Sequence, residues 1–226
     1  MAVEPKVAQR SRAHQRYRLT DGTIVPGVTT VLGVINKPAL VKWANNLGLQ
    51  GIDSSKYVDE TARIGTLAHE MVQEHLGGPK WDRYAYTPEQ IDLAENAVLS
   101  FFEWERQNVT SFKTVFIEEQ FVSEKSRFGG TIDFYGELNG QMWLVDFKTC
   151  KALYPEHTYQ TAAYRALLLE HGYRVDGARI LRIGRSEDEG FDDHIIGREE
   201  IEDAYRVFDC ALKLYQAKSS FERRCK

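Results

Sequence analysis

One hairpin constrains the fold of this chain more than any other feature. Gly130 to Leu138 and Gln141 to Thr149 have the composition of strands, and Asn139-Gly140 between them is a strong signal for a two-residue turn. Each strand carries an acid, Asp133 in the first and Asp146 at the end of an apolar run in the second. We therefore expect the two carboxylates to lie close together on adjacent antiparallel strands.

Two carboxylates at such a sheet edge favour a bound cation. At about 4 Å apart they repel by about 4 kcal/mol at an effective dielectric near 20. A divalent ion removes this cost, and hard oxygen ligands suit Mg²⁺ or Mn²⁺. Lys148 is two residues beyond Asp146 and projects to the same side. Two acids and a lysine at the rim of a sheet are the minimum set for metal-assisted phosphodiester hydrolysis. In such a reaction Lys148 can position the attacking water and neutralise the phosphorane. Phe147 points into the fold and leaves its backbone carbonyl near the acids.

Two further residues are candidate ligands. His69 lies within a predicted helix, where a packed or surface histidine is the alternative, and an imidazole ligand would favour Mn²⁺ over Mg²⁺. Strand alternation places Glu119 on the apolar face of Ile117 and Phe121, where an acid needs a partner or a metal. Glu118 points the opposite way in this interpretation and is the weaker candidate.

A later helix and three aromatic residues are candidates for contacts with a substrate. Gln160 and Tyr164 are four residues apart on a predicted helix and share a face, where both can hydrogen-bond a phosphate or a base edge. Ordinary boundary residues are the alternative. Trp43, Tyr57 and Trp81 are candidate stacking surfaces, although a place in the core is the favoured interpretation.

The remaining pattern predicts a helical first half followed by a sheet. We expect one domain over residues 1–226, with a mainly helical part over 1–110 and a sheet with a closing helix over 111–226. The expected elements are a hairpin at 17–25, a short helical segment at 28–35, helices at 38–49, 57–76, 87–107, 155–171 and 199–217, and strands at 114–122, 130–138, 141–149, 178–183 and 191–196.

Composition excludes several classes of protein. The chain has a hydrophobic content of 42%, and no apolar run approaches the roughly 20 residues of a membrane span. No signal peptide is recognisable, so we expect a cytoplasmic protein. Three scattered cysteines, Cys150, Cys210 and Cys225, fit neither a disulfide framework nor a metal knuckle. The net charge is −4, but basic residues gather at both ends, where they can help hold a polyanion.

Four motifs in order resemble the PD-(D/E)XK nuclease superfamily, and within it the RecB-like exonuclease branch. They are G-x-x-x-H at Gly65 and His69, G-G-T-I-D at 129–133, D-F-K-T at 146–149, and Q-x-x-x-Y at Gln160 and Tyr164. The segment at 25–32 also looks like the start of phage members and of the mitochondrial genome maintenance exonuclease. The departures are Ile132 where many members have proline, and the absence of the four cysteines of iron–sulfur relatives. No phosphate-binding loop of a fused motor occurs in the sequence.

The resemblance implies an α/β fold with a mixed central sheet flanked by helices. It implies that His69, Asp133, Asp146 and the Phe147 carbonyl hold one or two Mg²⁺ or Mn²⁺ ions, with Lys148 as the catalytic lysine. Glu119 matches a glutamate that often precedes the G-x-x-D strand. Gln160 and Tyr164 would organise the site and contact DNA, and we assign a DNA contact to Thr149 as well.

The expected activity is hydrolysis of DNA phosphodiester bonds. An exonuclease acting on single strands or free ends, in a bacterial or phage-infected cell and together with replication, recombination or repair proteins, follows from the resemblance alone. Two alternatives stay open: a site-specific or structure-specific endonuclease on the same fold, and a non-catalytic DNA-binding subunit.

Overall fold

The structure is a computed structural model that describes residues 16–186 and 189–225. The strands are β1 (Tyr17–Arg18), β2 (Ile24–Val25), β3 (Phe112–Ser123), β4 (Phe128–Leu138), β5 (Gln141–Lys148), β6 (Gly177–Ile183) and β7 (Phe191–Ile196). The helices are α1 (Val28–Leu32), α2 (Pro38–Leu49), α3 (Ser54–His75), α4 (Pro88–Asn108), α5 (Pro155–Glu170) and α6 (Arg198–Arg224), with a short 3₁₀ turn at Arg83–Ala85.

Within the described residues, five strands form a mixed sheet in the order β3-β4-β5-β6-β7. The neighbours are antiparallel except β5 and β6, which run parallel. Parallel neighbours need a crossover connection, and α5 supplies it. The predicted fold class, a mixed sheet flanked by helices, is confirmed.

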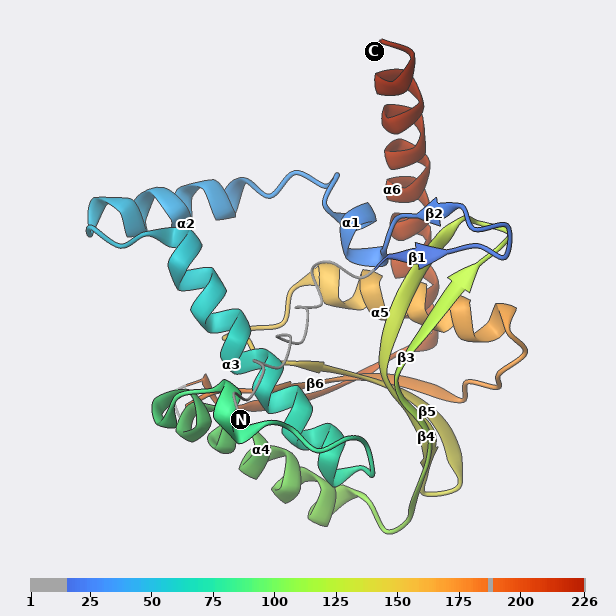
Figure 1. The fold of residues 1–226 in the computed structure, drawn as a ribbon. Coiled ribbons are helices and arrows are strands. Elements are labelled where there is room, and N and C mark those ends of the chain that lie inside the picture. Colours follow the sequence, from blue (N-terminus) through green and yellow to red (C-terminus); the bar gives the residue numbers. More distant parts are fainter. Residues whose placement is uncertain (1–15, 187–188, 226) are drawn as a thin grey trace, which may run out of the picture.

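Helices cover both faces of this sheet (Figure 1). One buried cluster joins the sheet to α1, α5 and α6, and we call it the α5 core. The other joins the sheet to α3 and α4, and we call it the α4 core. Leu144 and Val145 are successive residues of β5, and they belong to the α5 core and the α4 core respectively. A strand buried on both faces reads as a continuous apolar run, which explains the sequence before Asp146.

Local signals set several element boundaries. The Asp53 side chain accepts hydrogen bonds from the amides of Ser55 and Lys56, so α3 begins at Ser54 rather than at the expected Tyr57. Thr87 and Gln90 form the capping box that starts α4. The β4–β5 turn has φ of +52° at Asn139 and +80° at Gly140, as the hairpin signal requires.

One helix extends beyond its predicted end, and another has its predicted bounds but leaves the sheet. α6 continues to Arg224 instead of ending near Ala217, and Arg223 and Arg224 in its last turn complement the helix dipole. α2 has no buried residue and extends away from the sheet (Figure 1). None of the helices in the described part of the chain combines the length and apolar character needed to cross a bilayer.

Candidate metal centre

Three side chains from three elements meet where α3 lies against the β3–β4 pair. His69 comes from α3, Glu118 from β3 and Asp133 from β4, and one ligand atom of each lies within 4.8 Å of the other two. His69 is 6% exposed and Asp133 is 5% exposed, and Nδ1 of His69 is 3.7 Å from Oδ2 of Asp133. Two carboxylates and an imidazole are a donor set that fits a divalent cation such as Mn²⁺ or Mg²⁺. The structure therefore brings together His69 and Asp133, which the sequence singled out.

The structure corrects the expected position of Glu119, which is exposed, whereas Glu118 joins the cluster. Pairing of Ile117 with Phe134, and of Glu119 with Ile132, leaves Glu118 opposite Asp133. Glu118 has a φ of +53°, in the left-handed region that side chains seldom adopt, and this interrupts strand alternation.

The two core assignments confirm the interruption. Ile117 packs on the α4 core and Phe121 lies in the α5 core, although strict alternation would put both on one face. A further register shift between Thr114 and Phe116 adds to the irregularity of this strand. The expectation that Ile117, Glu119 and Phe121 share a face was wrong for this reason.

Gln73 supports the cluster, but it was not identified from the sequence. Its Nε2 donates a hydrogen bond to Oε1 of Glu118 at 2.8 Å, and the residue is 6% exposed. Gln73 lies four residues after His69 and therefore on the same face of α3. That spacing was the available signal, because a buried amide one turn from a candidate ligand is placed to orient another ligand.

Asp133 is held by the strand that carries the second acid. Registered pairing of β4 with β5 ends at Phe134 and Val145. Just beyond that point the Phe147 amide donates a hydrogen bond to Oδ2 of Asp133 at 2.9 Å. The Phe147 ring is 2% exposed and meets the His69 ring edge-on at 5.9 Å. Phe147 thus points into the fold as expected, and it fixes both His69 and Asp133.

Asp146 and Lys148 project together, as predicted. Asp146 is 1% exposed, and Nζ of Lys148 contacts its Oδ2. Among the described residues, the group whose ligand atoms all lie within 4.8 Å consists of His69, Glu118 and Asp133, so Asp146 lies beside this group rather than inside it. The expected metal contacts of Asp146 and of the Phe147 carbonyl stay predictions.

Tyr164 lies beneath both acids. Burial, followed by the charges of Asp146 and Asp133, raises the pKa of the Tyr164 hydroxyl well above its usual value, so this group remains protonated. Nε2 of Gln160 donates to the Tyr164 oxygen at 2.7 Å. With 5% of its surface exposed, Tyr164 cannot serve as a stacking surface, and its arrangement fits the expected role in organising the site. Contact of Gln160 with DNA stays a prediction.

Two glycines in the strand that carries Asp133 leave room for two aromatic side chains to pack against it. A Cβ at Gly130 would lie 2.5 Å from the Tyr164 ring, and a Cβ at Gly129 would lie 2.5 Å from the side chain of Tyr17. The Tyr17 hydroxyl is 3.0 Å from Oγ1 of Thr131. The N-terminal hairpin is thereby attached to β4 two residues before Asp133. Sequence reasoning missed Tyr17 and Thr131, because 114 positions separate them.

A third glycine explains how α3 approaches β5. A Cβ at Gly65 would lie 2.4 Å from Oγ1 of Thr149. Thr149 is half-buried at this contact, directly after Lys148. Its predicted contact with DNA is untested, whereas its contact with α3 accounts for the glycine of the G-x-x-x-H motif.

The candidate stacking residues occupy different environments. Trp43 and Tyr57 are 36% and 37% exposed, and their ring centroids are 5.9 Å apart. The favoured interpretation that both are core residues was therefore wrong, because α2 has no buried residue and Tyr57 lies in the exposed first turns of α3. Trp81 is partly buried against the α4 core.

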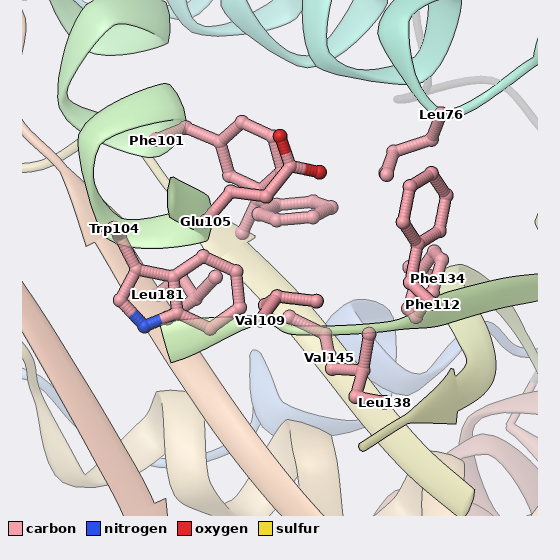
Figure 2. A pocket seen from close by; sticks show the side chains of 11 residues that line it. Leu76, Phe101, Trp104, Glu105, Val109, Phe112, Phe134, Leu138, Val145 and Leu181 are labelled. Carbon is pink, nitrogen blue, oxygen red and sulfur yellow. The ribbon is translucent and has the colours of Figure 1, made fainter. Parts of the chain in front are cut away.

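An apolar pocket lies behind the site, between α4 and the sheet (Figure 2). Phe101 and Trp104 of α4 line it together with Val145, Phe147 and Leu181 of the sheet. Its lining has a single ionisable side chain, that of Glu105. The pocket therefore offers packing support behind Phe147 and no donor set for an ion.

Comparison with known proteins gives a match to one family over most of the chain. The sequence model described as "PD-(D/E)XK nuclease superfamily" matches residues 42–222. No curated protein matches the chain. The chain is also similar to the solved structure "Crystal structure of SSO0001", with 13% identity and a TM-score of 0.29 over 66% of this chain and 85% of that chain. A similarity this weak carries no argument about function.

Proposed function

The chain belongs to the PD-(D/E)XK nuclease superfamily, and from that premise we propose that it is an exonuclease that hydrolyses DNA phosphodiester bonds at free ends or in single strands. Membership of this superfamily implies a nuclease that depends on divalent metal ions. The observation that carries the proposal is the cluster of His69, Glu118 and Asp133 beside Asp146 and Lys148. A binding module has no need of a partly buried lysine next to such a ligand set.

Each residue of the site has a distinct proposed role. His69, Glu118 and Asp133 would hold Mg²⁺ or Mn²⁺, with Asp146 and the Phe147 carbonyl as further ligands of one or two ions. A bound ion polarises the scissile phosphate and lowers the pKa of the attacking water. Lys148 supplies a compact positive charge next to Asp146, where it orients that water and offsets the negative charge of the phosphate.

Two exposed aromatic rings support a single-stranded substrate. Trp43 of α2 and Tyr57 of α3 are 36% and 37% exposed, and their ring centroids are 5.9 Å apart. Rings presented in this way suit stacking with the unstacked bases of a single strand.

The four motifs in order support assignment to the RecB-like branch, and with it a role in replication, recombination or repair alongside the proteins of those pathways. In that branch, the residues G-x-x-x-H and Q-x-x-x-Y accompany the two acids and the lysine. Here Gly65 makes room for Thr149, and Gln160 hydrogen-bonds Tyr164 beneath the acids.

The test is digestion of linear DNA labelled at either end, single-stranded and double-stranded, with Mn²⁺ and with closed circular DNA as the control. We expect stepwise shortening of the linear substrates, no cutting of the circle, and digestion by Lys148→Ala that is slowed by roughly 10²- to 10⁴-fold. Nicking of the circle would instead identify an endonuclease. Binding of DNA without digestion of any substrate, in Mn²⁺ or in Mg²⁺, would contradict enzymatic activity.

A further inference from the structure

A histidine outside the four motifs lies on the same face of α5 as the residues of the site. His157 precedes Gln160 by three residues and Tyr164 by seven, and these spacings place all three on one face of the helix. His157 is half-buried in the first turn of α5. The face that organises the acids through Tyr164 therefore ends in an imidazole.

Local contacts determine which nitrogen of this imidazole carries the proton. The backbone amide of Tyr154 donates a hydrogen bond to Nδ1 of His157 at 3.2 Å. Nδ1 must then be the acceptor, so the ring proton is on Nε2. Within residues 16–186 and 189–225, Nε2 has no hydrogen-bond partner. His157 therefore presents a donor that the fold does not use.

The surroundings keep this imidazole neutral. Burial, and after it the positive charge of Lys148, lowers the pKa of His157 to about 4, while Glu156 opposes the shift and Lys37 adds to it. Lys37 and Glu156 are themselves paired at 3.3 Å. At neutral pH, His157 is an uncharged donor within the field of the catalytic lysine.

We infer that His157 is a further substrate-binding residue, whose Nε2–H donates a hydrogen bond to a non-bridging oxygen of the DNA phosphate that Lys148 contacts. This inference rests on the proposed function. An acid at this position would compete with the phosphate for Lys148, and a second cation would repel the Lys148 ammonium. A neutral donor does neither, and it adds a directional contact to the charge that Lys148 provides.

The same surroundings argue against a metal ion at His157. A divalent cation on Nε2 would lie in the field of the Lys148 ammonium, which already disfavours a positive charge on this ring. The group that an available N–H and a nearby ammonium favour together is an anion. In a nuclease, that anion is the phosphate of the substrate.

Two substitutions separate this role from a purely structural one. In His157→Asn, the side-chain oxygen can take the place of Nδ1 and accept the Tyr154 amide, but the outward donor is lost. In His157→Gln, the longer amide can return a donor near the position of Nε2. The readouts are kcat and KM with Mn²⁺, and binding of a fluorescein-labelled single-stranded oligonucleotide with Ca²⁺ in place of Mn²⁺. A third readout is the dependence of this binding on salt.

We expect His157→Asn to lower kcat/KM and oligonucleotide affinity by roughly 10-fold, with an unchanged salt slope because a neutral donor displaces no counterion. His157→Gln should recover most of both. Wild-type behaviour of His157→Asn, equal losses in both variants, or a reduced salt slope would each overturn the inference. If the wild type digests no DNA, the proposed function fails instead, and the two failures are thereby distinguished.

One measurement on the wild-type protein does not depend on how the variants fold. The ring nitrogens of His157 can be followed by ¹⁵N magnetic resonance while the same oligonucleotide is added in Ca²⁺. We expect the Nε2 resonance and its proton to shift as a hydrogen bond forms, while Nδ1 stays an acceptor. An unchanged Nε2 resonance at saturating oligonucleotide would overturn the inference.

Discussion

Phe147 and Asp133 are joined by a hydrogen bond from the backbone amide of Phe147 to Oδ2 of Asp133, 2.9 Å long and buried. This bond takes over where the registered pairing of β4 with β5 stops. Asp133 therefore has two functions, since it continues the contact between the strands and also faces His69 as a candidate metal ligand.

The two functions of Asp133 predict different outcomes for two substitutions. Asp133→Asn keeps an oxygen that accepts the Phe147 amide, so we expect this variant to fold. Loss of a residue that only supports a metal ligand lowers metal affinity by roughly 10- to 100-fold. Loss of the Asp133 charge should therefore lower Mn²⁺ affinity by at least this much. Asp133→Ala also leaves a buried amide without its acceptor, at a cost of about 1–3 kcal/mol. Calorimetric Mn²⁺ titration and urea unfolding measure the two effects. Equal stability of the two variants would contradict the structural role.

Lys148→Ala should affect both the rate and the stability. We expect digestion to slow by roughly 10²- to 10⁴-fold, as for loss of a group that assists proton transfer. Because Asp146 is 1% exposed, losing the lysine that contacts it should cost about 3–5 kcal/mol in metal-free protein. Mn²⁺ should then stabilise the variant more than the wild type. Exposed Lys151 provides the control, and Lys151→Ala should match the wild type in metal-free stability.

Adjacent glutamates provide a matched pair. Glu118→Gln keeps an oxygen for the Gln73 amide but removes a charge from the cluster, so Mn²⁺ affinity and digestion should both fall. Glu119→Gln changes an exposed side chain on the same strand and should leave both quantities unchanged. Calorimetry with Mn²⁺ and the linear-DNA assay test the pair. If Glu119→Gln lowered Mn²⁺ affinity and digestion more than Glu118→Gln does, Glu119 would belong to the site, as strict alternation predicts.

Gly65→Ala tests the contact between α3 and β5. Alanine in place of glycine inside a helix normally stabilises by about 1 kcal/mol. At Gly65, the new Cβ would lie 2.4 Å from Oγ1 of Thr149, so this gain should be lost unless Thr149→Ala is also present. Gly48→Ala in α2 is the control, because a Cβ there has no atom of the described structure within 4 Å. Urea unfolding of the single and double variants measures the coupling, and a gain at Gly65 equal to that at Gly48 would contradict it.

The sequence predicted the elements whose determinants are local. Asn139-Gly140 fixes a turn through two residues with positive φ, and Thr87 with Gln90 starts a helix through its own side chains. Burial of β5 on both faces likewise accounts for the continuous apolar run before Asp146. These features involve neighbours in the chain, so composition and spacing are enough to recognise them.

What the sequence did not predict depends on distant partners. The left-handed φ of Glu118 arises where β3 pairs irregularly with β4, and a single residue type does not signal it. The bond between Tyr17 and Thr131 requires the whole sheet to form first. Trp43 has the apolar spacing of a buried helix face, yet no residue of α2 is buried and Trp43 itself is 36% exposed.

The pH dependence of stability should report on His157. The folded residue has a pKa of about 4 against an ordinary value of 6.5, because of burial and then of Lys148. Between those pH values, the unfolded chain binds a proton that the folded protein does not. The contribution of His157 to the free energy of unfolding is therefore fully present above pH 6.5, and it declines as the pH falls towards 4.

His157→Gln removes this titration, so its stability should fall less than that of the wild type over the same interval. The gap between the two pKa values sets an upper bound of about 3 kcal/mol on the difference, and partial exposure of the ring reduces it. Urea unfolding of both proteins at pH values from neutral to about 4 measures the two slopes. His194→Gln, at an exposed contact of the His194 ring with Glu200, is the control for loss of a histidine elsewhere. Parallel pH profiles for the wild type and His157→Gln would show that the imidazole is not kept neutral by its surroundings, which would contradict its role as an uncharged donor.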